Sequence, residues 1–484
     1  MRGILLVINT SNRRPGGAAA LLAMLCAGLV PFATDAAAAK LRIGTSGDYP
    51  PYSEAVDEAP VPYQGFDIAL ALAYARDRGH RIEFVRFRWS KLRDDLASKK
   101  FDIAMSGVTV RPLRSVVGRF TVPLLETGAV VLTRAVERFE SIHDLDRRKT
   151  RIGVNAGGHL EQVAREHFHS ATLVFIRENS AVLEALVGYT IDAAVTDSIE
   201  APLWQAADPE LGVIGPFTRD RKAYLVRADR PELARDLDQW LLQREADGTL
   251  GKLRRQYFGP LKDRAPTTAL VALVAALDER LSLMPWVVAA KREHGLPITS
   301  RRREKVVLAT AMTDIRAAEE QAGRAAWPEP GVRALFEAQI SAAKQVQLAA
   351  GRDPEFEPET PLPQLDRALR PAILRIGDRI SWLLTELPDD LDPLWVKKTV
   401  RRGLRSRYLS PTSVNGIADA LSDLVKAGRE QPAAQGHAAG PSANEAPSQQ
   451  SGEDGQNEAG GESHQREPPA QDGNLPGDQP VDGQ

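Results

Sequence analysis

The hydrophobic periodicity of this 484-residue chain changes once, near residue 265, and this change limits what the chain can fold into. Before it, short apolar runs alternate with segments of helical periodicity. After it, helical periodicity continues and no convincing strand pattern remains. The first pattern predicts an α/β unit with mostly parallel sheets, and the second predicts an all-α unit. The length also fits two folded domains.

The two patterns predict different elements. In the first unit we expect strands at 41–45, 82–85, 103–105, 129–132, 152–154, 173–176, 193–195 and 223–226, with helices at 66–78, 92–99, 160–167, 181–188 and 232–247. In the second we expect helices at 268–294, 299–322, 330–351, 364–387, 393–407 and 411–426. Ligands of α/β units bind at the carboxyl ends of the strands, often against helix N-termini.

The N-terminal residues 1–39 have the pattern of a secretory signal peptide. Arginines precede an apolar core at about 18–33, and small residues follow at 35–39. We expect cleavage near Ala38 or Ala39, export to a bacterial periplasm and no membrane anchor afterwards. The only cysteine, Cys26, lies in this segment, so the mature chain is expected to have no disulfide and no thiolate metal site. No metal or cofactor is expected.

The other end, residues 428–484, is predicted to be a disordered acidic tail. It holds 2 basic and 10 acidic residues, and its only large aliphatic residues are Leu475 and Val481. Residues 40–427 hold 57 basic and 53 acidic residues, which is too mild a charge to suggest a nucleic-acid partner. The predicted domains are therefore 1–39, 40–261, a linker at 262–267, 268–427, and 428–484.

One stretch of the helical unit, 277–304, carries cations in an apolar context: Arg280, Lys291 and Arg303. Arg280 and Lys291 are eleven residues apart, which is close to three turns at about 3.6 residues per turn, so both project from one face. A cation on a buried face is costly unless an anion meets it there. The stretch therefore suggests a pocket for a ligand that carries carboxylates, the alternative being a solvated basic helix face.

Three motifs of the first unit point to a family when taken in order. They are YPPY at 49–52, QGFDI at 64–68 and FDIAMSGVT at 101–109, the last followed by Arg111 and Arg114. This order resembles the periplasmic solute-binding proteins of the polar amino-acid family. The resemblance implies a two-lobed periplasmic-binding-protein fold of type 2 that closes on its ligand. It also implies that Arg114, with Thr109 beside it, binds a ligand carboxylate.

Further segments resemble an enzymatic branch of that family, the cyclohexadienyl dehydratases, which remove water and carbon dioxide from prephenate or arogenate. The segments are FDIAMSG at 101–107, NAGG at 155–158 and DAAVTDSIE at 192–200. The resemblance implies that Glu200 is the general acid. His159 stands where that branch usually has threonine, and it either donates to a carboxylate or has a capping or surface role.

The same resemblance assigns further residues of the first unit to the substrate-binding site. The amides of Gly157 and Gly158 would hold a carboxylate, and Thr196 and Asp197 would lie at the mouth of the site or serve as a helix cap. Lys222 would orient either Glu200 or the substrate, and the sequence leaves this choice open.

The helical unit resembles the secreted all-α chorismate mutases of the γ subclass. The resemblance rests on the cationic stretch, on FEAQISAAKQVQ at 336–347 and on the segment from Arg370 to Arg379. It implies that Gln347 and Lys291 face the ether oxygen of the substrate and that Glu304 meets its hydroxyl. Substrate carboxylates would be bound by the three arginines Arg280, Arg303 and Arg379. Members of this subclass are often dimeric, so a homo-oligomer is possible.

Together the two units predict a bifunctional periplasmic enzyme. The second would make prephenate from chorismate without a cofactor, and the first would convert prephenate to phenylpyruvate, or arogenate to phenylalanine. Small-molecule substrates are the expected partners, with a homo-oligomer left open. The competing hypothesis is a binding protein that delivers an amino acid or a cyclohexadienyl acid to a transporter, fused to an active mutase.

Overall fold

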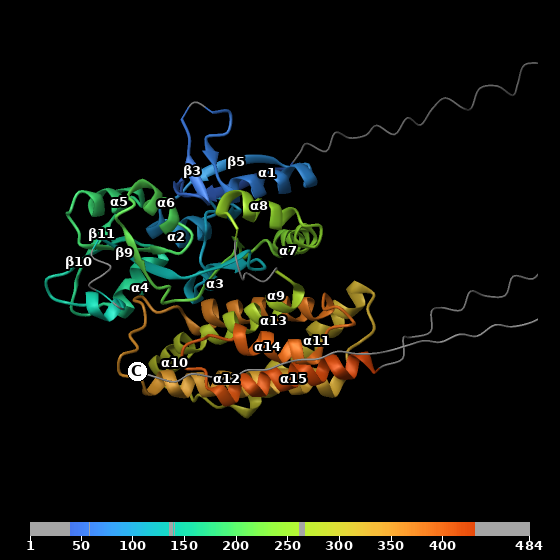
Figure 1. Ribbon diagram of the computed structural model, residues 1–484. Helices are drawn as coiled ribbons and strands as arrows, with labels where there is room; N and C mark the ends of the chain where they lie inside the picture. The colour runs from blue at the N-terminus through green and yellow to red at the C-terminus, as the bar shows by residue number, and fades with distance from the viewer. Residues whose placement is uncertain (1–38, 58, 135–138, 140, 261–266, 431–484) are drawn as a thin grey trace, which may run out of the picture. The chain divides into compact units, whose positions relative to one another are not determined.

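The computed structural model describes residues 39–57, 59–134, 139, 141–260 and 267–430. The predicted signal peptide, most of the predicted linker and nearly all of the predicted acidic tail lie outside these residues. Within the described chain, strands and helices alternate up to Phe258, and only helices follow from Ala269 onwards (Figure 1). The predicted fold class, a two-lobed α/β unit followed by an all-α unit, is confirmed.

The first lobe is built on a five-stranded sheet with the order β5-β1-β6-β15-β7. Strand β1 pairs in parallel with both β5 and β6, and β15 is antiparallel to its two neighbours. Its strands are β1 (Lys40–Thr45), β5 (Arg81–Arg86), β6 (Ile103–Ala104), β7 (Gly118–Phe120) and β15 (Leu225–Arg227). Its helices are α1 (Phe66–Arg78), α2 (Leu92–Ala97), α3 (Pro112–Val117), α7 (Pro231–Ala246) and α8 (Thr249–Phe258).

The second lobe has a sheet with the order β11-β10-β12-β9-β13. Every residue of β9 and β12 is buried, as expected for strands covered on both faces. The strands are β9 (Ala129–Thr133), β10 (Arg151–Asn155), β11 (Thr172–Ile176), β12 (Ala193–Asp197) and β13 (Gly212–Ile214). The helices are α4 (His159–His167), α5 (Ser180–Val187) and α6 (Ala201–Ala207).

The chain passes between the lobes along a two-stranded antiparallel ribbon of β8 (Leu125–Thr127) and β14 (Asp220–Lys222). The last residue of β14, Lys222, also forms an isolated bridge with Thr109 of the first lobe. A small sheet of β2 (Asp48–Tyr49), β3 (Ser53–Ala55) and β4 (Tyr63–Gln64) precedes α1. These connections place Lys222 and Tyr49 near the junction of the two lobes.

The largest difference between the helical unit and the expectation lies in its first predicted helix. The single helix predicted at 268–294 is two helices that meet at Leu283, because Pro285 at the start of the second cannot donate a backbone hydrogen bond to the preceding turn. The helices are α9 (Ala269–Ser282), α10 (Met284–Glu293), α11 (Arg301–Ala322), α12 (Glu329–Arg352), α13 (Arg370–Thr385), α14 (Pro393–Gly403) and α15 (Pro411–Arg429).

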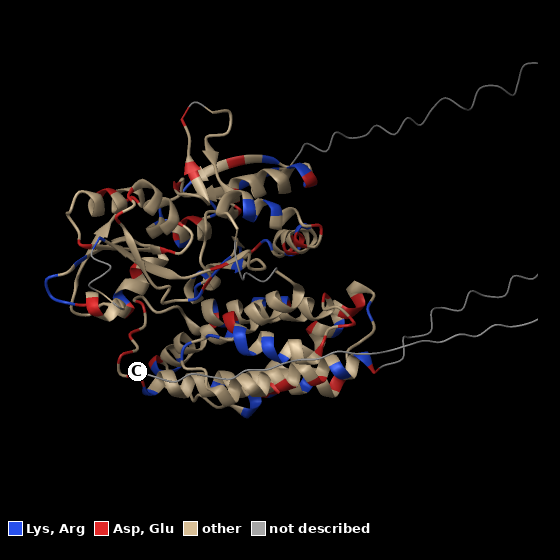
Figure 2. Ribbon diagram, in the orientation of Figure 1, with Lys and Arg blue, Asp and Glu red and all other residues tan. Residues whose placement is uncertain are grey.

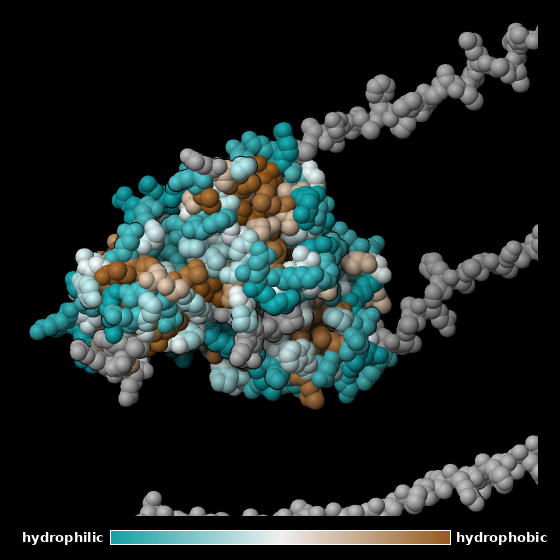
Figure 3. Space-filling model, turned by 45° about the horizontal axis from the view of Figure 1, so that its top comes forward, coloured by the Kyte–Doolittle hydropathy of each residue, from teal (hydrophilic) through white to brown (hydrophobic). Residues whose placement is uncertain are grey.

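The interior of the helical unit is apolar, whereas its surface is mixed in charge. Leu273, Leu277 and Leu281 of α9 are fully buried, at spacings of four residues that keep them on one side of the helix. Both signs of charge are spread over the helices and loops in Figure 2. In Figure 3, hydrophilic residues surround separate apolar patches. Among the described residues, no helix is both long and apolar enough to cross a membrane.

Candidate functional site

A small cavity lies where the two lobes of the α/β unit meet. Its volume is about 30 Å³, which is less than a substrate with two carboxylates needs, so such a ligand enters only if the lobes separate. The side chains and backbone that line it come from both lobes and from β14. They are Tyr49, Trp89, Gly107, Thr109, Arg114, Asn155, Gly158, His159, Leu160, Asn179 and Lys222.

Arg114, on the short helix α3, is a buried cation in this cavity. It is 6% exposed, its Nη1 donates to the carbonyl of Thr109 at 2.8 Å, and its guanidinium lies over the Trp89 ring. Among the described residues, no Asp or Glu acts on its charge. Burial, reinforced by two neighbouring arginines, lowers its pKa to about 9. A buried cation without a counter-ion is costly, so the site favours an anionic ligand.

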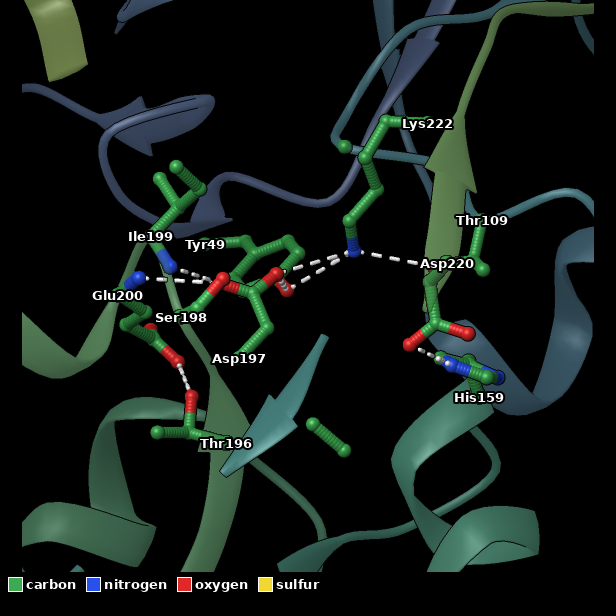
Figure 4. A network of polar contacts seen from close by, with 12 residues as sticks. Tyr49, Thr109, His159, Thr196, Asp197, Ser198, Ile199, Glu200, Asp220 and Lys222 are labelled. Atoms are coloured by element: carbon green, nitrogen blue, oxygen red, sulfur yellow. Dashed lines mark hydrogen bonds and ion pairs between the residues drawn. The ribbon is translucent and has the colours of Figure 1, made fainter. Parts of the chain in front are cut away.

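Lys222 is the centre of a polar network that joins the lobes (Figure 4). Its Nζ lies 3.1 Å from Asp197 Oδ2 and donates to the hydroxyls of Tyr49 at 3.1 Å and Thr109 at 3.0 Å. The Tyr49 hydroxyl in turn donates to Asp197. Lys222 lines the cavity, and its carboxylate partner in the described residues is Asp197 rather than Glu200.

Asp197 remains ionised although it is fully buried. Burial raises its pKa, but Lys222, the Tyr49 hydroxyl and the backbone amides of Glu200 and Ile199 outweigh this effect and hold the pKa below its usual range. The carboxylate therefore caps the turn that leads into α6 while it neutralises Lys222. Asp197 does not itself line the cavity.

Glu200 differs from the ionised Asp197 in its protonation state. It is 1% exposed, Asn179 Nδ2 donates to its Oε1 at 2.6 Å, and the Thr196 hydroxyl donates to its Oε2. Burial raises its pKa to about 8, with Asp197 adding to the effect. The acid is therefore protonated at neutral pH. It lies behind Asn179, which lines the cavity, so contact with a ligand requires Asn179 to turn aside.

The predicted carboxylate site at the start of α4 is only partly present. Gly158 lines the cavity, whereas the amide of Gly157 donates to Glu161 Oε2 at 2.6 Å and is not available. Gly157 has φ +77° and approaches Ser90 closely, so no side chain fits there. His159 is 8% exposed and lines the cavity, which excludes the surface role considered for it.

A second cavity, of about 150 Å³, lies among the helices of the all-α unit. It is lined by residues from α9 to α13, and five cations and two carboxylates contribute to its wall. The cations are Arg280, Lys291, Arg303, Lys344 and Arg370, and the carboxylates are Glu304 and Asp314. The structure thus brings together the predicted residues Arg280, Lys291, Arg303, Glu304 and Gln347.

Arg280 is the counterpart of Arg114 in this second cavity. It is 7% exposed, and its side-chain hydrogen bond among the described residues is a long one, 3.4 Å, to Gln339 Oε1. Burial lowers its pKa to about 10. Arg303, in contrast, is exposed at the edge of the cavity. An unpaired buried guanidinium beside an exposed one forms a binding site for a ligand with negative charge at two points.

Lys291 and Gln347 form a pair on the cavity wall. Lys291 Nζ donates to Gln347 Oε1 at 3.0 Å and to the carbonyl of Ile298 at 2.9 Å. Burial lowers the pKa of Lys291, and Arg370 contributes to the same shift. Glu304 accepts from Lys344 at 3.1 Å through Oε2, while its Oε1 is buried without a hydrogen-bond partner among the described residues.

Arg379 does not line this cavity, whereas Arg370 on the same helix does. Arg379 Nε donates to Asp238 Oδ2 at 3.0 Å, and its Nη1 lies 3.5 Å from Glu279, outside the cavity. The two arginines are nine residues apart on α13. At about 100° per residue they project from opposite sides of the helix. Arg370, Ile373 and Leu374 all line the cavity, as this periodicity requires.

Several lining residues were not identified from the sequence. Tyr49 lies inside a quoted motif, and its position in YPPY was the available signal; Asn155 likewise opens NAGG. Lys344 lies in the quoted segment FEAQISAAKQVQ, whereas Asn179 and Asp314 had no signal beyond their residue type. In the part of the chain that the structure describes, no group of three or more His, Cys, Asp or Glu side chains could hold a metal ion.

The fold and the two cavities define a class of protein: a two-lobed solute-binding domain joined to an all-helical mutase-like domain. Family models agree with this division. Residues 41–260 match the bacterial extracellular solute-binding proteins of family 3, and residues 271–348 match chorismate mutase type II.

The relatives of the α/β unit include an enzyme and transport proteins. The cyclohexadienyl dehydratase of Pseudomonas aeruginosa is 34% identical over 215 residues, which cover 43% of this chain and 79% of that protein. The ABC transporter arginine-binding protein 1 of Escherichia coli is 29% identical and covers 49% of this chain and 98% of that protein.

One solved structure that is similar to the α/β unit is the ancestral amino acid-binding protein AncCDT-1, described as a precursor of cyclohexadienyl dehydratase. It is 33% identical, with a TM-score of 0.43, and the match covers 45% of this chain and 95% of that one. The identity and coverage of the dehydratase relative place the chain in its family. The chain belongs to family 3 of the extracellular solute-binding proteins, and it carries a chorismate mutase type II domain in addition.

Proposed function

We propose that the chain is a bifunctional enzyme of aromatic amino-acid biosynthesis. Its helical domain rearranges chorismate to prephenate, and its two-lobed domain converts prephenate to phenylpyruvate, or arogenate to phenylalanine. The observation that carries the second assignment is Glu200, a buried and protonated carboxyl group. Its hydrogen-bond partner Asn179 lines the same cavity as the buried Arg114. A protein that only binds its ligand needs the arginine but has no use for the acid.

The dehydration requires one proton and one anchored carboxylate. Glu200 donates its proton to the ring hydroxyl, and the carbon–oxygen bond breaks to release water. The bond to the ring carboxylate breaks in the same process, its electrons complete the aromatic ring, and carbon dioxide leaves. Glu200 then regains a proton from solvent. Arg114 holds a substrate carboxylate. Lys222 keeps the hydroxyls of Tyr49 and Thr109 in position at the cavity wall.

The mutase reaction needs neither acid nor base. One carbon–oxygen bond breaks while one carbon–carbon bond forms within the same molecule, so the domain acts by holding a compact conformation and by stabilising charge. Arg280 and Arg370 hold the carboxylates. Lys291 and the amide of Gln347 donate toward the ether oxygen, where negative charge develops. The unpaired Oε1 of Glu304 accepts from the substrate hydroxyl.

A periplasmic location is part of the same proposal. Relatives in family 3 include the histidine-binding periplasmic protein of Salmonella typhimurium. The predicted signal peptide, 1–39, has the composition that export requires, with cleavage expected near Ala38 or Ala39. We further propose that the small-molecule substrates are the principal partners.

Feeding the full-length mature chain with chorismate tests both activities together. Prephenate is expected to appear first and phenylpyruvate after it, as two successive absorbance changes. Addition of prephenate alone should give phenylpyruvate directly. Accumulation of prephenate without phenylpyruvate would favour the second candidate, a binding protein for transport fused to an active mutase, which the arginine-binding relatives make reasonable. Absence of both products would contradict the proposal.

The pH dependence of dehydration should follow Glu200. Because its pKa is raised to about 8, the acid form is present below that pH and is lost above it. We expect kcat/KM for prephenate to be constant in the neutral range and to fall about tenfold per pH unit above pH 8, which steady-state kinetics on added prephenate will measure. A rate that rises through the same range would rule out a protonated Glu200.

A further inference from the structure

One edge of the mutase cavity follows a short continuous stretch of chain at the start of α11. The lining residues in this stretch are Ile298, Ser300, Arg303 and Glu304. Arg301 is bonded to Ser300, Arg302 to Arg303 and Lys305 to Glu304, and consecutive Cα atoms are about 3.8 Å apart. Three cations that do not line the cavity therefore stand directly at its edge.

These three cations are exposed and have no partner of opposite charge. Among the described residues, Arg301, Arg302 and Lys305 form no ion pair and no side-chain hydrogen bond. The nearest carboxylate along the chain, Glu304, is already paired with Lys344 at 3.1 Å. Over the longer segment 291–305 there are six cations and two carboxylates, which is a net charge of +4.

The position of these cations is unfavourable for the helix that carries them. Helix α11 begins at Arg301, so the positive charges occupy its first turns. A helix N-terminus already carries partial positive charge from its unpaired backbone N–H groups and favours Asp or Glu there. The cap is supplied by Ser300, whose hydroxyl accepts from the Arg303 amide at 3.4 Å. The charges therefore oppose helix stability, and their use has to lie outside the helix.

The cavity beside them has an excess of the same charge. Two of its cations are neutralised by ion pairs, which are Lys344–Glu304 and Arg370–Asp366. Arg280, Lys291 and Arg303 remain, and the other carboxylate of the wall is Asp314. Arg280 is 7% exposed and has no carboxylate partner among the described residues. Positive charge is therefore in excess both inside the cavity and at its edge.

We propose that Arg301, Arg302 and Lys305 form a capture surface for small dianions at the edge of the mutase cavity. The inference rests on the proposed mutase function and adds three residues that do not line the cavity. Charges act over a Debye length, about 10 Å at 0.1 M salt, and this range includes the cavity edge. A focused positive potential raises the encounter rate and the apparent affinity for an anion. The ligand that the capture surface fits is a small molecule with two carboxylates.

The double variant Arg301→Gln, Arg302→Gln tests the capture surface in the full chain. Glutamine has a similar helix propensity and removes both charges. At about 0.01 M salt, where the Debye length is about 30 Å, kcat/KM for chorismate should fall at least about fivefold with kcat unchanged. At about 1 M salt the Debye length is about 3 Å, and the variant should match the unaltered chain. No loss at low salt, or a loss that persists at high salt, would overturn the inference.

The matched control is the double variant Lys398→Gln, Arg401→Gln on α14. It removes two exposed cations from a helix that contributes no residue to the cavity. We expect kcat/KM for chorismate to stay within about twofold of the unaltered chain at both salt concentrations. An equal loss in this control would mean that the net charge of the chain, rather than the position of the cations, accounts for the effect, and the inference would fail.

A separate measurement distinguishes failure of the capture surface from failure of the mutase function. If the unaltered chain did not rearrange chorismate, the proposed mutase function would be wrong. Calorimetric affinity for chorismate at the two salt concentrations would then decide the inference by itself. Weaker binding by the Arg301→Gln, Arg302→Gln variant at low salt alone would support the capture surface, whereas equal binding, or no binding to either chain, would overturn it.

Discussion

Glu200→Gln should abolish phenylpyruvate formation from prephenate, with a loss of about 10²–10⁴-fold in kcat, the usual contribution of a general acid. Glutamine has nearly the same shape and can keep the contacts with Asn179 and Thr196, but it has no acidic proton to give. Prephenate binding should survive, because Arg114 is untouched. Single-turnover kinetics and calorimetry on the same preparation measure the two quantities.

The control for this variant is Glu184→Gln. Glu184 is an exposed carboxylate on α5 of the same lobe, and its replacement should leave dehydration unchanged. Mutase activity should be normal in both variants, which shows that each chain is folded. If the Glu200 variant dehydrated prephenate at the normal rate, another residue would have to be the general acid.

Lys291→Met should reduce chorismate rearrangement by about 10²–10³-fold, as removal of one donor to a developing negative charge does in other enzymes. Methionine keeps the unbranched stem and removes the ammonium group that donates to Gln347 and to the carbonyl of Ile298. The effect should appear mainly in kcat, because the carboxylate contacts of Arg280 and Arg370 remain. Disappearance of chorismate is followed directly by absorbance.

The neighbouring residue gives a matched control for that variant. Arg292 is exposed on the same helix and donates to the carbonyl of Gly351, away from the cavity. Arg292→Met removes a cation of the same helix and should leave turnover within about twofold, as is usual for surface substitutions. Dehydration of added prephenate should be normal in both. Equal losses in the two variants would mean that net charge, rather than a positioned ammonium, accounts for the effect.

The two proposed activities share a compound, because the product of the helical domain is the substrate of the two-lobed domain. Both cavities use the same physical device, a buried arginine without a carboxylate partner: Arg280 in one and Arg114 in the other. Both substrates carry two carboxylates, so a desolvated guanidinium gains a counter-ion only when the ligand binds. The difference lies in the acid, which the dehydration requires and the rearrangement does not.

The sequence was sufficient where a pattern is local. Buried strands such as 193–195 and helices such as 66–78 were predicted because apolar periodicity depends only on neighbours along the chain. The spacing of Arg280 and Lys291 predicted one shared face on a continuous helix, and Arg303 came from the family resemblance. The helix is divided at Leu283, yet all three residues line one cavity. Short elements such as α3 and β14 were not, because three to six residues carry too little periodicity to be distinguished from a turn.

Contacts between distant residues were outside the reach of the sequence. Whether Lys222 serves Glu200 or another group depends on the arrangement of β14 against Tyr49 and Asp197, which no local pattern encodes. Similarly, Pro285 divides the predicted helix 268–294, yet both halves still contribute to one cavity. The protonation of Glu200 follows from burial, which is a property of the folded chain.

The amino-acid sequence by itself determined the division into an α/β and an all-α unit, the families that each resembles and most of the charged residues that line the cavities. These features depend on periodicity and on ordered motifs. Only the tertiary structure decided that Arg370 rather than Arg379 lines the mutase cavity, because the helix turns opposite sides toward different neighbours. It also decided that His159 is paired with Asp220 in the wall of the other cavity, since desolvation and pairing arise when distant segments pack together.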